Sequence, residues 1–172
     1  MKKTVLSVLV VLVCAAFSFG QDVQIKDQTP FTYAYLECSG SFSQISGKIG
    51  EFMTAYFSQG LNPSGALLAI YFNTPDQVPE AELKWLIGMP VSTDVTPAAP
   101  LQKGEFKHPK VASCIHVGPY DKAAETYVKM TAYLELNGWK IAGPAMEWYL
   151  DNPMSVAPEN LRTEIILPVE KK

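Results

Sequence analysis

The chain has 172 residues, of which 48% are hydrophobic and 18% are charged, and its formal net charge is −3. This length is enough for one domain with a packed core. The acidic balance, without a basic stripe, argues against nucleic acid as a partner. The sequence shows no ligand spacing for a metal, no cofactor motif, and no serine or cysteine nucleophile motif.

The first twenty residues have the order of a secretory signal. Two lysines precede the apolar run 5–17, and small residues then lead to Gln21. A spanning helix needs about 20 apolar residues, so a retained membrane anchor is the less favoured alternative. We therefore expect residues 1–20 to be removed and residues 21–172 to form one domain without a membrane partner. The expected location is periplasmic or secreted.

The rest of the chain contains two copies of one unit, which recur at a constant offset along the sequence. Inside the helix of each unit, a one-residue shift aligns Met53–Tyr56 with Met130–Tyr133. Agreement along a whole unit predicts a tandem duplication. The pairs matched at the constant offset are Gly60 with Gly138, Gly65 with Gly143, Tyr71 with Tyr149, Pro75 with Pro153, and Pro90 with Pro168.

Repeat one is predicted over residues 30–91, a surface linker over 92–107, and repeat two over 108–169. The residues of each repeat predict a strand, a helix and two more strands. In repeat one, Ile45, Ile49, Phe52 and Tyr56 recur at helical spacing up to Gly60.

In repeat two, apolar alternation predicts a strand over residues 111–117, and helical spacing predicts a helix that stops at Asn137-Gly138. Two further strands are predicted over 145–150 and 161–169. The expected fold class is α+β, with antiparallel sheets, one helix per repeat and a cleft between the repeats. Such junctions are common ligand sites. Cys38 and Cys114 could form a disulfide or remain buried thiols, and the sequence leaves both open.

The last two predicted strands carry the main candidate ligand-binding residues. We expect Met146 and Trp148 to face the helices together with Ile165, and Glu147, Tyr149, Arg162, Glu164 and Ile166 to share the opposite face. A carboxylate between aromatic rings suits an organic cation, or a general acid or base. The alternative is a solvated face on which Glu147 pairs with Arg162.

Comparison of the repeats adds further candidates. Tyr71 corresponds to Tyr149, whereas Ala69 and Leu86 stand where repeat two has Glu147 and Glu164. Acids from one repeat and tyrosines from both could therefore line the cleft, although drift on a surface would produce the same pattern. Trp85, His116 and Tyr120 are further candidate ligand-binding residues, and each has a structural alternative. Trp85 could belong to the core, and His116, which shares the expected non-core face with Cys114, could be a structural histidine. Tyr120 could cap the cleft or pack against the start of the helix.

Three segments resemble hallmarks of the GyrI-like family, which includes the effector-binding domains of AraC-type and MerR-type multidrug-sensing activators. They are residues 117–120 (VGPY), 143–149 (GPAMEWY) and 161–169 (LRTEIILPV). The resemblance implies a duplicated β-α-β-β fold with a cleft between the copies. It also implies a buried glutamate on the final strand, at Glu164, which faces aromatic residues and accepts cationic, lipophilic compounds. Tyr149 and Glu147 would lie nearby.

Some members of the family are hydrolases of strained cyclopropane-bearing compounds, so an enzyme with Glu164 as general acid or base is an alternative. The sequence contains no DNA-binding domain, and the regulator role therefore does not transfer. The favoured function is extracytoplasmic binding of a small lipophilic or cationic molecule in the inter-repeat cleft. A partner-binding or structural protein with a vestigial cleft is the third reading.

Overall fold

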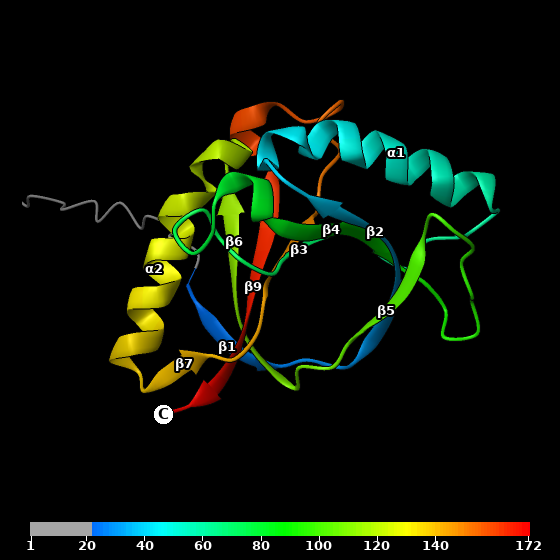
Figure 1. The fold of residues 1–172 in the computed structure, drawn as a ribbon. Helices are drawn as coiled ribbons and strands as arrows, with labels where there is room; N and C mark the ends of the chain where they lie inside the picture. The colour runs from blue at the N-terminus through cyan, green and yellow to red at the C-terminus, as the bar shows by residue number, and fades with distance from the viewer. Residues whose placement is uncertain (1–21) are drawn as a thin grey trace, which may run out of the picture.

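Two helices lie on the outer face of one curved antiparallel sheet in the computed structural model, which describes residues 22–172 (Figure 1). The predicted signal, residues 1–20, lies outside the described residues. The strand order is β1-β6-β9-β8-β3-β4-β2-β5, and β7 pairs with β9. The elements are β1 (Gln24–Asp27), β2 (Phe31–Ser39), α1 (Ile45–Ser58), β3 (Leu67–Tyr71), β4 (Lys84–Pro90), β5 (Gln102–Phe106), β6 (Lys110–Val117), α2 (Ala123–Leu136), β7 (Trp139–Ile141), β8 (Ala145–Tyr149) and β9 (Arg162–Lys171).

The expected α+β duplication is confirmed: β2-α1-β3-β4 is repeated as β6-α2-β8-β9. The helices begin at positions related by the repeat offset and have the same length of 14 residues. Their buried positions, Phe52 and Tyr56 in α1 and Met130 and Leu134 in α2, keep this offset without a shift. The one-residue shift expected inside the helix is therefore wrong, because burial and not letter identity sets the equivalence.

The two repeats exchange their edge strands. β1 and β5 also begin at positions related by the repeat offset, Gln24 and Gln102. β1 pairs with β6 of repeat two, and β5 pairs with β2 of repeat one. The segment 92–107, expected as a surface linker, therefore contains a strand. The pairs Lys26–Val111 and Gly104–Tyr33 occupy equivalent places in the two halves.

A pseudo-twofold axis passes between the central strands β3 and β8. These strands pair in antiparallel fashion with Ala69 directly opposite Glu147, and these two residues occupy the same position in their respective repeats. Both repeats therefore contribute side chains to this junction. The helices flank the junction on the outer face of the sheet (Figure 1).

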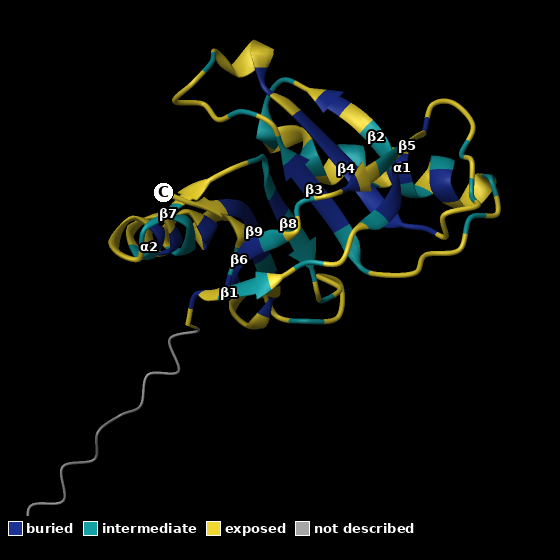
Figure 2. Ribbon diagram, turned by 90° about the horizontal axis from the view of Figure 1, so that it is seen from below, coloured by how far each residue is buried: buried dark blue, intermediate teal, exposed yellow. Residues whose placement is uncertain are grey.

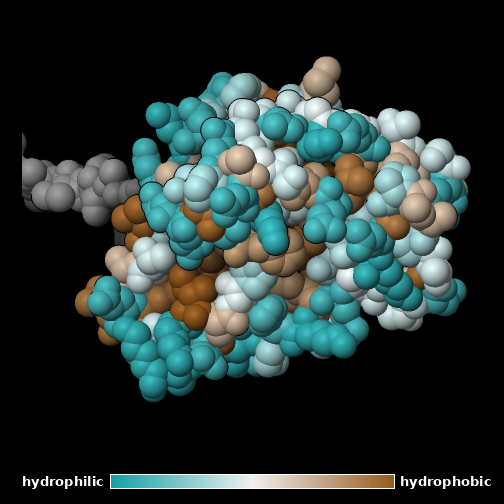
Figure 3. Space-filling view, viewed as in Figure 1, coloured by the Kyte–Doolittle hydropathy of each residue, from teal (hydrophilic) through white to brown (hydrophobic). Residues whose placement is uncertain are grey.

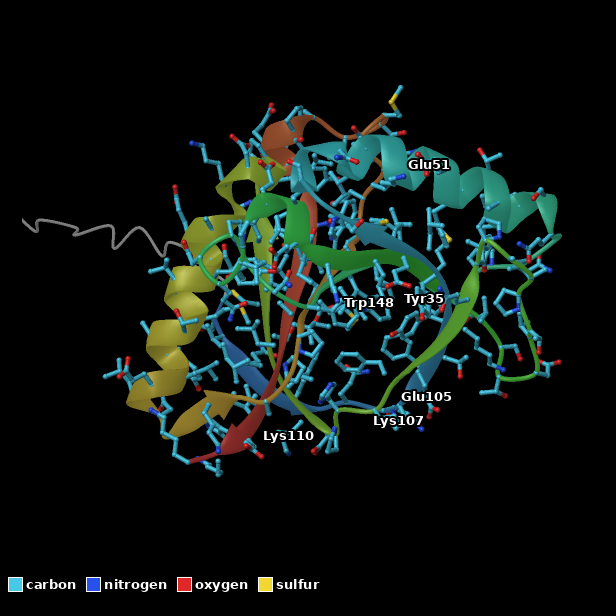
Figure 4. The ribbon with its side chains drawn as sticks, in the orientation of Figure 1. Tyr35, Glu51, Glu105, Lys107, Lys110 and Trp148 are labelled. Carbon is cyan, nitrogen blue, oxygen red and sulfur yellow. The ribbon has the colours of Figure 1, made fainter. Side chains whose placement is uncertain are left out.

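Both faces of the central strands are covered: β3 is mostly buried, and β8 is half-buried except for the buried Met146 (Figure 2). The helices cover the outer face, where each helix packs on its own cluster of strand residues. The sheet curves strongly around its inner face, so that the rings of Phe31 on β2 and Trp148 on β8 lie 5.4 Å apart although β3 and β4 separate these strands. Tyr35 and Trp148 lie within this curve (Figure 4). Seen from its open end, hydrophobic residues gather in the middle with hydrophilic residues around them (Figure 3).

Cys38 and Cys114 are both buried, and neither forms a disulfide within residues 22–172. They lie under different helices, Cys38 in the α1 cluster and Cys114 in the α2 cluster. Burial raises the pKa of the Cys38 thiol to about 11, so this cysteine stays protonated at neutral pH. Within residues 22–172, none of the helices has the length and apolar character that crossing a membrane requires.

Candidate functional site

The candidate residues of the last two strands do not share one face. In the register of β8 and β9, Glu147 is opposite Ile165, Tyr149 is opposite Thr163, and Trp148 is opposite Glu164. Residues directly opposite each other point to the same face. Glu147 and Tyr149 therefore face the helices, and Glu164 lies on the inner face.

The expected grouping of Glu147 and Tyr149 with Arg162, Glu164 and Ile166 is consequently wrong. The prediction assumed that only the face of Met146 and Trp148 could pack against helices. Those two side chains instead belong to the inner cluster with Ile166. Because both faces of this sheet are buried, apolar alternation does not reveal which face meets the helices.

On the helix face, four residues form what we call the Glu147 cluster: Glu147, Tyr71, Tyr127 and Tyr149. Tyr127 of α2 donates a hydrogen bond to Glu147 Oε1 at 2.9 Å. Tyr71 and Tyr149 each lie within hydrogen-bond distance of Oε2, at 3.2 and 3.1 Å, and their hydroxyl oxygens are 3.1 Å apart. One carboxylate is thus held by hydroxyls from both repeats at the pseudo-twofold axis.

The three tyrosines of this cluster remain neutral hydrogen-bond donors at physiological pH. Burial raises the pKa of Tyr71 and of Tyr149 well above the ordinary value, and the nearby Glu147 charge raises it further. Burial and the same charge also raise the pKa of Tyr127. Neutral donors stabilise a carboxylate without cancelling its charge.

Glu147 has no cationic partner among residues 22–172. The alternative pairing with Arg162 does not occur. Arg162 donates instead to both carboxylate oxygens of Asp151, from Nε at 3.0 Å and from a terminal nitrogen at 2.8 Å. The carboxylate of Glu147 is therefore the charge at this junction that a bound cation could neutralise.

Glu164 lies on the inner face in a different environment. Lys26 of β1 places its ammonium 2.6 Å from Glu164 Oε1, and the Ser113 hydroxyl donates to the same oxygen. The side chain of Glu164 is 18% exposed. This acid, implied by the family resemblance to be the cation acceptor, is already paired with a lysine of its own chain.

The other candidates divide between the site and the core. Tyr120, 41% exposed, lies edge-on to Tyr149 with ring centroids 5.3 Å apart, and thus borders the Glu147 cluster. Trp85 is fully buried under α1 and donates from Nε1 to the Gly40 carbonyl. His116 is buried on the helix face, not on a non-core face.

Both ring nitrogens of His116 are engaged, with Thr126 Oγ1 at 3.0 Å and with the Pro119 carbonyl at 3.1 Å. Both nitrogens therefore have partners within the protein. The structure therefore brings together Glu147, Tyr149, Tyr71 and Tyr120 and separates them from Glu164. Trp85 is directly opposite Tyr71 on the helix face but is fully buried. The role of these residues in binding stays a prediction.

Three residues of the two acid clusters were not among the candidates: Tyr127, Lys26 and Ser113. Tyr127 had a usable signal, since it lies on the buried face of the predicted helix. Lys26 had none, because it is on a four-residue strand that pairs with the other repeat. Across the described part of the chain, no group of three or more histidine, cysteine, aspartate or glutamate side chains could hold a metal ion.

A family model described as a GyrI-like small molecule binding domain matches residues 21–170. The chain belongs to the GyrI-like family. This GyrI-like domain is accordingly a small-molecule binding domain, as the three sequence segments predicted. None of the curated proteins matches the chain.

Solved structures share the GyrI-like fold at low sequence identity. The EcmrR C-terminal domain is 18% identical, with a TM-score of 0.78 over 88% of this chain and 99% of that one. A longer EcmrR chain in a DNA complex has a TM-score of 0.79 at 18% identity over 89% of this chain, which spans 59% of its length.

Two further structures carry chemical information in their names. A hydrolase encoded by lin2189 from Listeria innocua has a TM-score of 0.69 and 13% identity, over 90% of this chain and 94% of that chain. SAV2435 bound to tetraphenylphosphonium has a TM-score of 0.54 and 15% identity, over 87% of this chain and 94% of that chain. At these identities the likeness shows the fold alone.

Proposed function

We propose that this GyrI-like domain binds a small lipophilic organic cation at the Glu147 cluster, outside the cytoplasm. The observation that carries the proposal is a carboxylate held by three neutral tyrosine hydroxyls at the junction of the repeats, without a cationic partner among residues 22–172. Aromatic rings beside a carboxylate attract a cation through Coulomb and cation–π contributions. SAV2435, of the same fold, has been solved with the lipophilic cation tetraphenylphosphonium.

The choice between the two acids follows from their partners. A cation at Glu164 would have to displace the Lys26 ammonium and compete with the Ser113 hydroxyl. A cation at Glu147 would displace no charge. The Glu147 cluster therefore gives the larger net gain on binding.

The extracytoplasmic location rests on the lysine start, the apolar run 5–17 and the small residues before Gln21. It is tested by cell fractionation together with the mass of the purified protein. A mature chain that begins at Gln21 in the extracytoplasmic fraction supports the proposal. A full-length chain in the cytoplasm contradicts it.

Hydrolysis is the second candidate, since a chain of similar fold is described as a hydrolase. In this chain the expected acid, Glu164, is ion-paired on the opposite face from the tyrosines. The tyrosines around Glu147 have raised pKa values, which makes them weak general acids at neutral pH. Binding without turnover is therefore the better supported function, and product analysis of bound ligand separates the two.

The decisive experiment is calorimetric titration of residues 21–172 with tetraphenylphosphonium. We expect Glu147→Gln to weaken binding about tenfold or more, since contacts with a charged group contribute about 1.5–3 kcal/mol. Glu164→Gln is the matched control and should change affinity less than about threefold, because Lys26 already neutralises that acid. Equal losses in both variants, or a loss only in Glu164→Gln, would contradict the choice of site.

A further inference from the structure

Strand β5 forms one outer edge of the sheet, and its free side carries unpaired backbone groups. Within residues 22–172, β5 pairs only with β2, and β1 forms the edge at the other end of the strand order. An edge strand presents a row of N–H and C=O groups with which another strand can pair. The side of β5 that faces away from β2 is therefore a candidate interaction surface.

The backbone groups on this free side belong to Lys103 and Glu105. In β2, the Thr32 carbonyl accepts a hydrogen bond from the residue that follows β4. Successive residues of a strand direct their backbone groups to opposite sides, so Tyr33 bonds β5 through its partner Gly104. The N–H and C=O of Lys103 and Glu105 consequently point away from β2. Outside the β2 ladder, neither residue has a backbone-to-backbone hydrogen bond within residues 22–172.

The sequence around Gly104 is self-complementary under a twofold axis. If two copies pair their β5 strands antiparallel about Gly104, Lys103 of each copy is directly opposite Glu105 of the other. All the outward N–H and C=O groups of both residues then become hydrogen-bonded. Lys103 and Glu105 also share one face of the sheet, because their partners in β2 are Ala34 and Thr32. Their opposite charges therefore meet across the pair.

Charges on an edge strand usually prevent such pairing, but those beside Gly104 have opposite sign and attract their counterparts in a second copy. The Glu105 side chain, 46% exposed, forms an ion pair with Lys107 at 3.0 Å. A pair this exposed contributes little, so Glu105 can exchange it at small cost. The Lys103 ammonium donates to the Thr93 carbonyl and has further hydrogen atoms to donate. Gly104 adds no side chain at the axis, where the Cα atoms approach to about 4.5 Å.

The equivalent edge strand β1 lacks this self-complementarity. Lys26 stands in β1 where β5 has Gly104, with Ile25 and Asp27 on either side. The same twofold pairing would place Lys26 against Lys26 of the second copy, although each already forms an ion pair with Glu164. Like charges directly opposite each other are destabilising. The pattern that fits a second copy is therefore specific to β5.

We infer that the domain forms a twofold-symmetric dimer, in which β5 pairs with β5 of a second copy about Gly104. Such a contact closes on itself, so association stops at the dimer. The Tyr33 ring flanks the axis on the inner face, since a Cβ at Gly104 would lie 2.6 Å from it. A five-residue edge gives an interface smaller than the about 1,200 Å² of stable complexes. The dimer therefore dissociates readily, with a Kd of about 1–100 µM.

Sedimentation velocity of residues 21–172 between about 1 and 500 µM tests the dimer. The wild-type domain should shift from monomer to dimer over this range. Lys103→Glu and Glu105→Lys should each weaken association about tenfold or more, because each sets like charges opposite one another. The double variant Lys103→Glu/Glu105→Lys restores opposite charges and should recover the dimer. An equimolar mixture of the two single variants should form a heterodimer for the same reason.

Glu105→Pro tests the backbone contact. It removes an N–H that points away from β2, and an edge strand tolerates proline at such a position. The domain should therefore stay folded, as circular dichroism would show, while dimerisation is lost. Asp27→Lys is the matched control, since Asp27 is the equivalent residue of β1. It should leave the dimer unchanged.

A wild-type domain that stays monomeric over the whole range would overturn the inference, as would a Glu105→Pro variant that still dimerises. Failure of the mixed single variants to associate would show that Lys103 and Glu105 do not face each other. Species larger than a dimer would indicate head-to-tail pairing of β5 with β1, and would also contradict the twofold contact. Because β3, β4 and β2 separate β5 from β8, none of these outcomes bears on cation binding at Glu147.

Discussion

Glu147 and Glu164 lie on neighbouring strands beside aromatic rings, yet their surroundings differ in kind. Glu147, on the outer face of the sheet, accepts hydrogen bonds from three neutral tyrosines. Glu164, on the inner face, forms an ion pair with the Lys26 ammonium at 2.6 Å. Hydroxyl donors hold a carboxylate in place and leave its charge, whereas an ammonium cancels it. The partners of an acid, more than its aromatic neighbours, decide whether it is available to a ligand.

The largest expected difference between the surroundings of the two acids is the loss of stability at alkaline pH that the tyrosines around Glu147 should cause. The folded state raises the pKa of Tyr71, Tyr127 and Tyr149, so it holds protons that the unfolded chain loses above about pH 10. Their contribution to stability is fully present below that pH and is lost as the pH rises, by about 1.4 kcal/mol per pH unit for each tyrosine. Urea unfolding between about pH 9 and pH 12 measures this slope. Tyr127→Phe should make the slope shallower, and an unchanged slope would contradict the arrangement.

Loss of one hydroxyl from the Glu147 cluster should have the next largest effect. Tyr127→Phe removes the donor to Glu147 Oε1 and should lower the free energy of unfolding by about 1.5–3 kcal/mol. Tyr133→Phe is the matched control on the same helix, where the hydroxyl makes no hydrogen bond within residues 22–172, and should cost less than about 0.5 kcal/mol. Equal losses would show that the Tyr127 hydroxyl does not support the acid.

Loss of the ion pair between Lys26 and Glu164 should have the smallest effect on the free energy of unfolding. Lys26→Met leaves the partly buried Glu164 without its cation and should lower the free energy of unfolding by about 1–2 kcal/mol. The double variant with Glu164→Leu copies the residue at the equivalent Leu86 and should recover most of this loss. Lys107→Met, in the exposed pair with Glu105, should change stability by less than about 0.5 kcal/mol. A double variant as unstable as Lys26→Met would disprove the pairing.

The duplication could be predicted because glycines, prolines and tyrosines at turns and strand ends recur at one spacing. The face of each acid could not. β8 alternates Met146 and Trp148 with Glu147 and Tyr149, and both sets are covered in this molecule, one by the inner core and the other by the helices. A pattern that distinguishes buried from exposed faces cannot distinguish two buried ones.

The edge strands were missed for a different reason. β5 has the sequence QKGEF, of which only Phe106 is buried, and β1 has only four residues. Neither shows apolar alternation long enough to predict a strand. Each forms because the other repeat offers an unpaired strand edge, which is information that no local pattern contains. The neutralisation of Glu164 by Lys26 was therefore beyond local sequence reasoning.

The exchange of edge strands also constrains how the chain can acquire its structure. β1 cannot find its partner until β6 exists, and Gln24 pairs with Ser113 across just over half of the chain. β2 likewise gains β5 only after the whole of repeat one has been made. Such long-range pairing slows folding, because the entropy cost of closing a long loop comes before the stabilising contacts that offset it. Neither half can therefore reach its final form alone, and β1, which is synthesised first, waits for β6 of the second repeat.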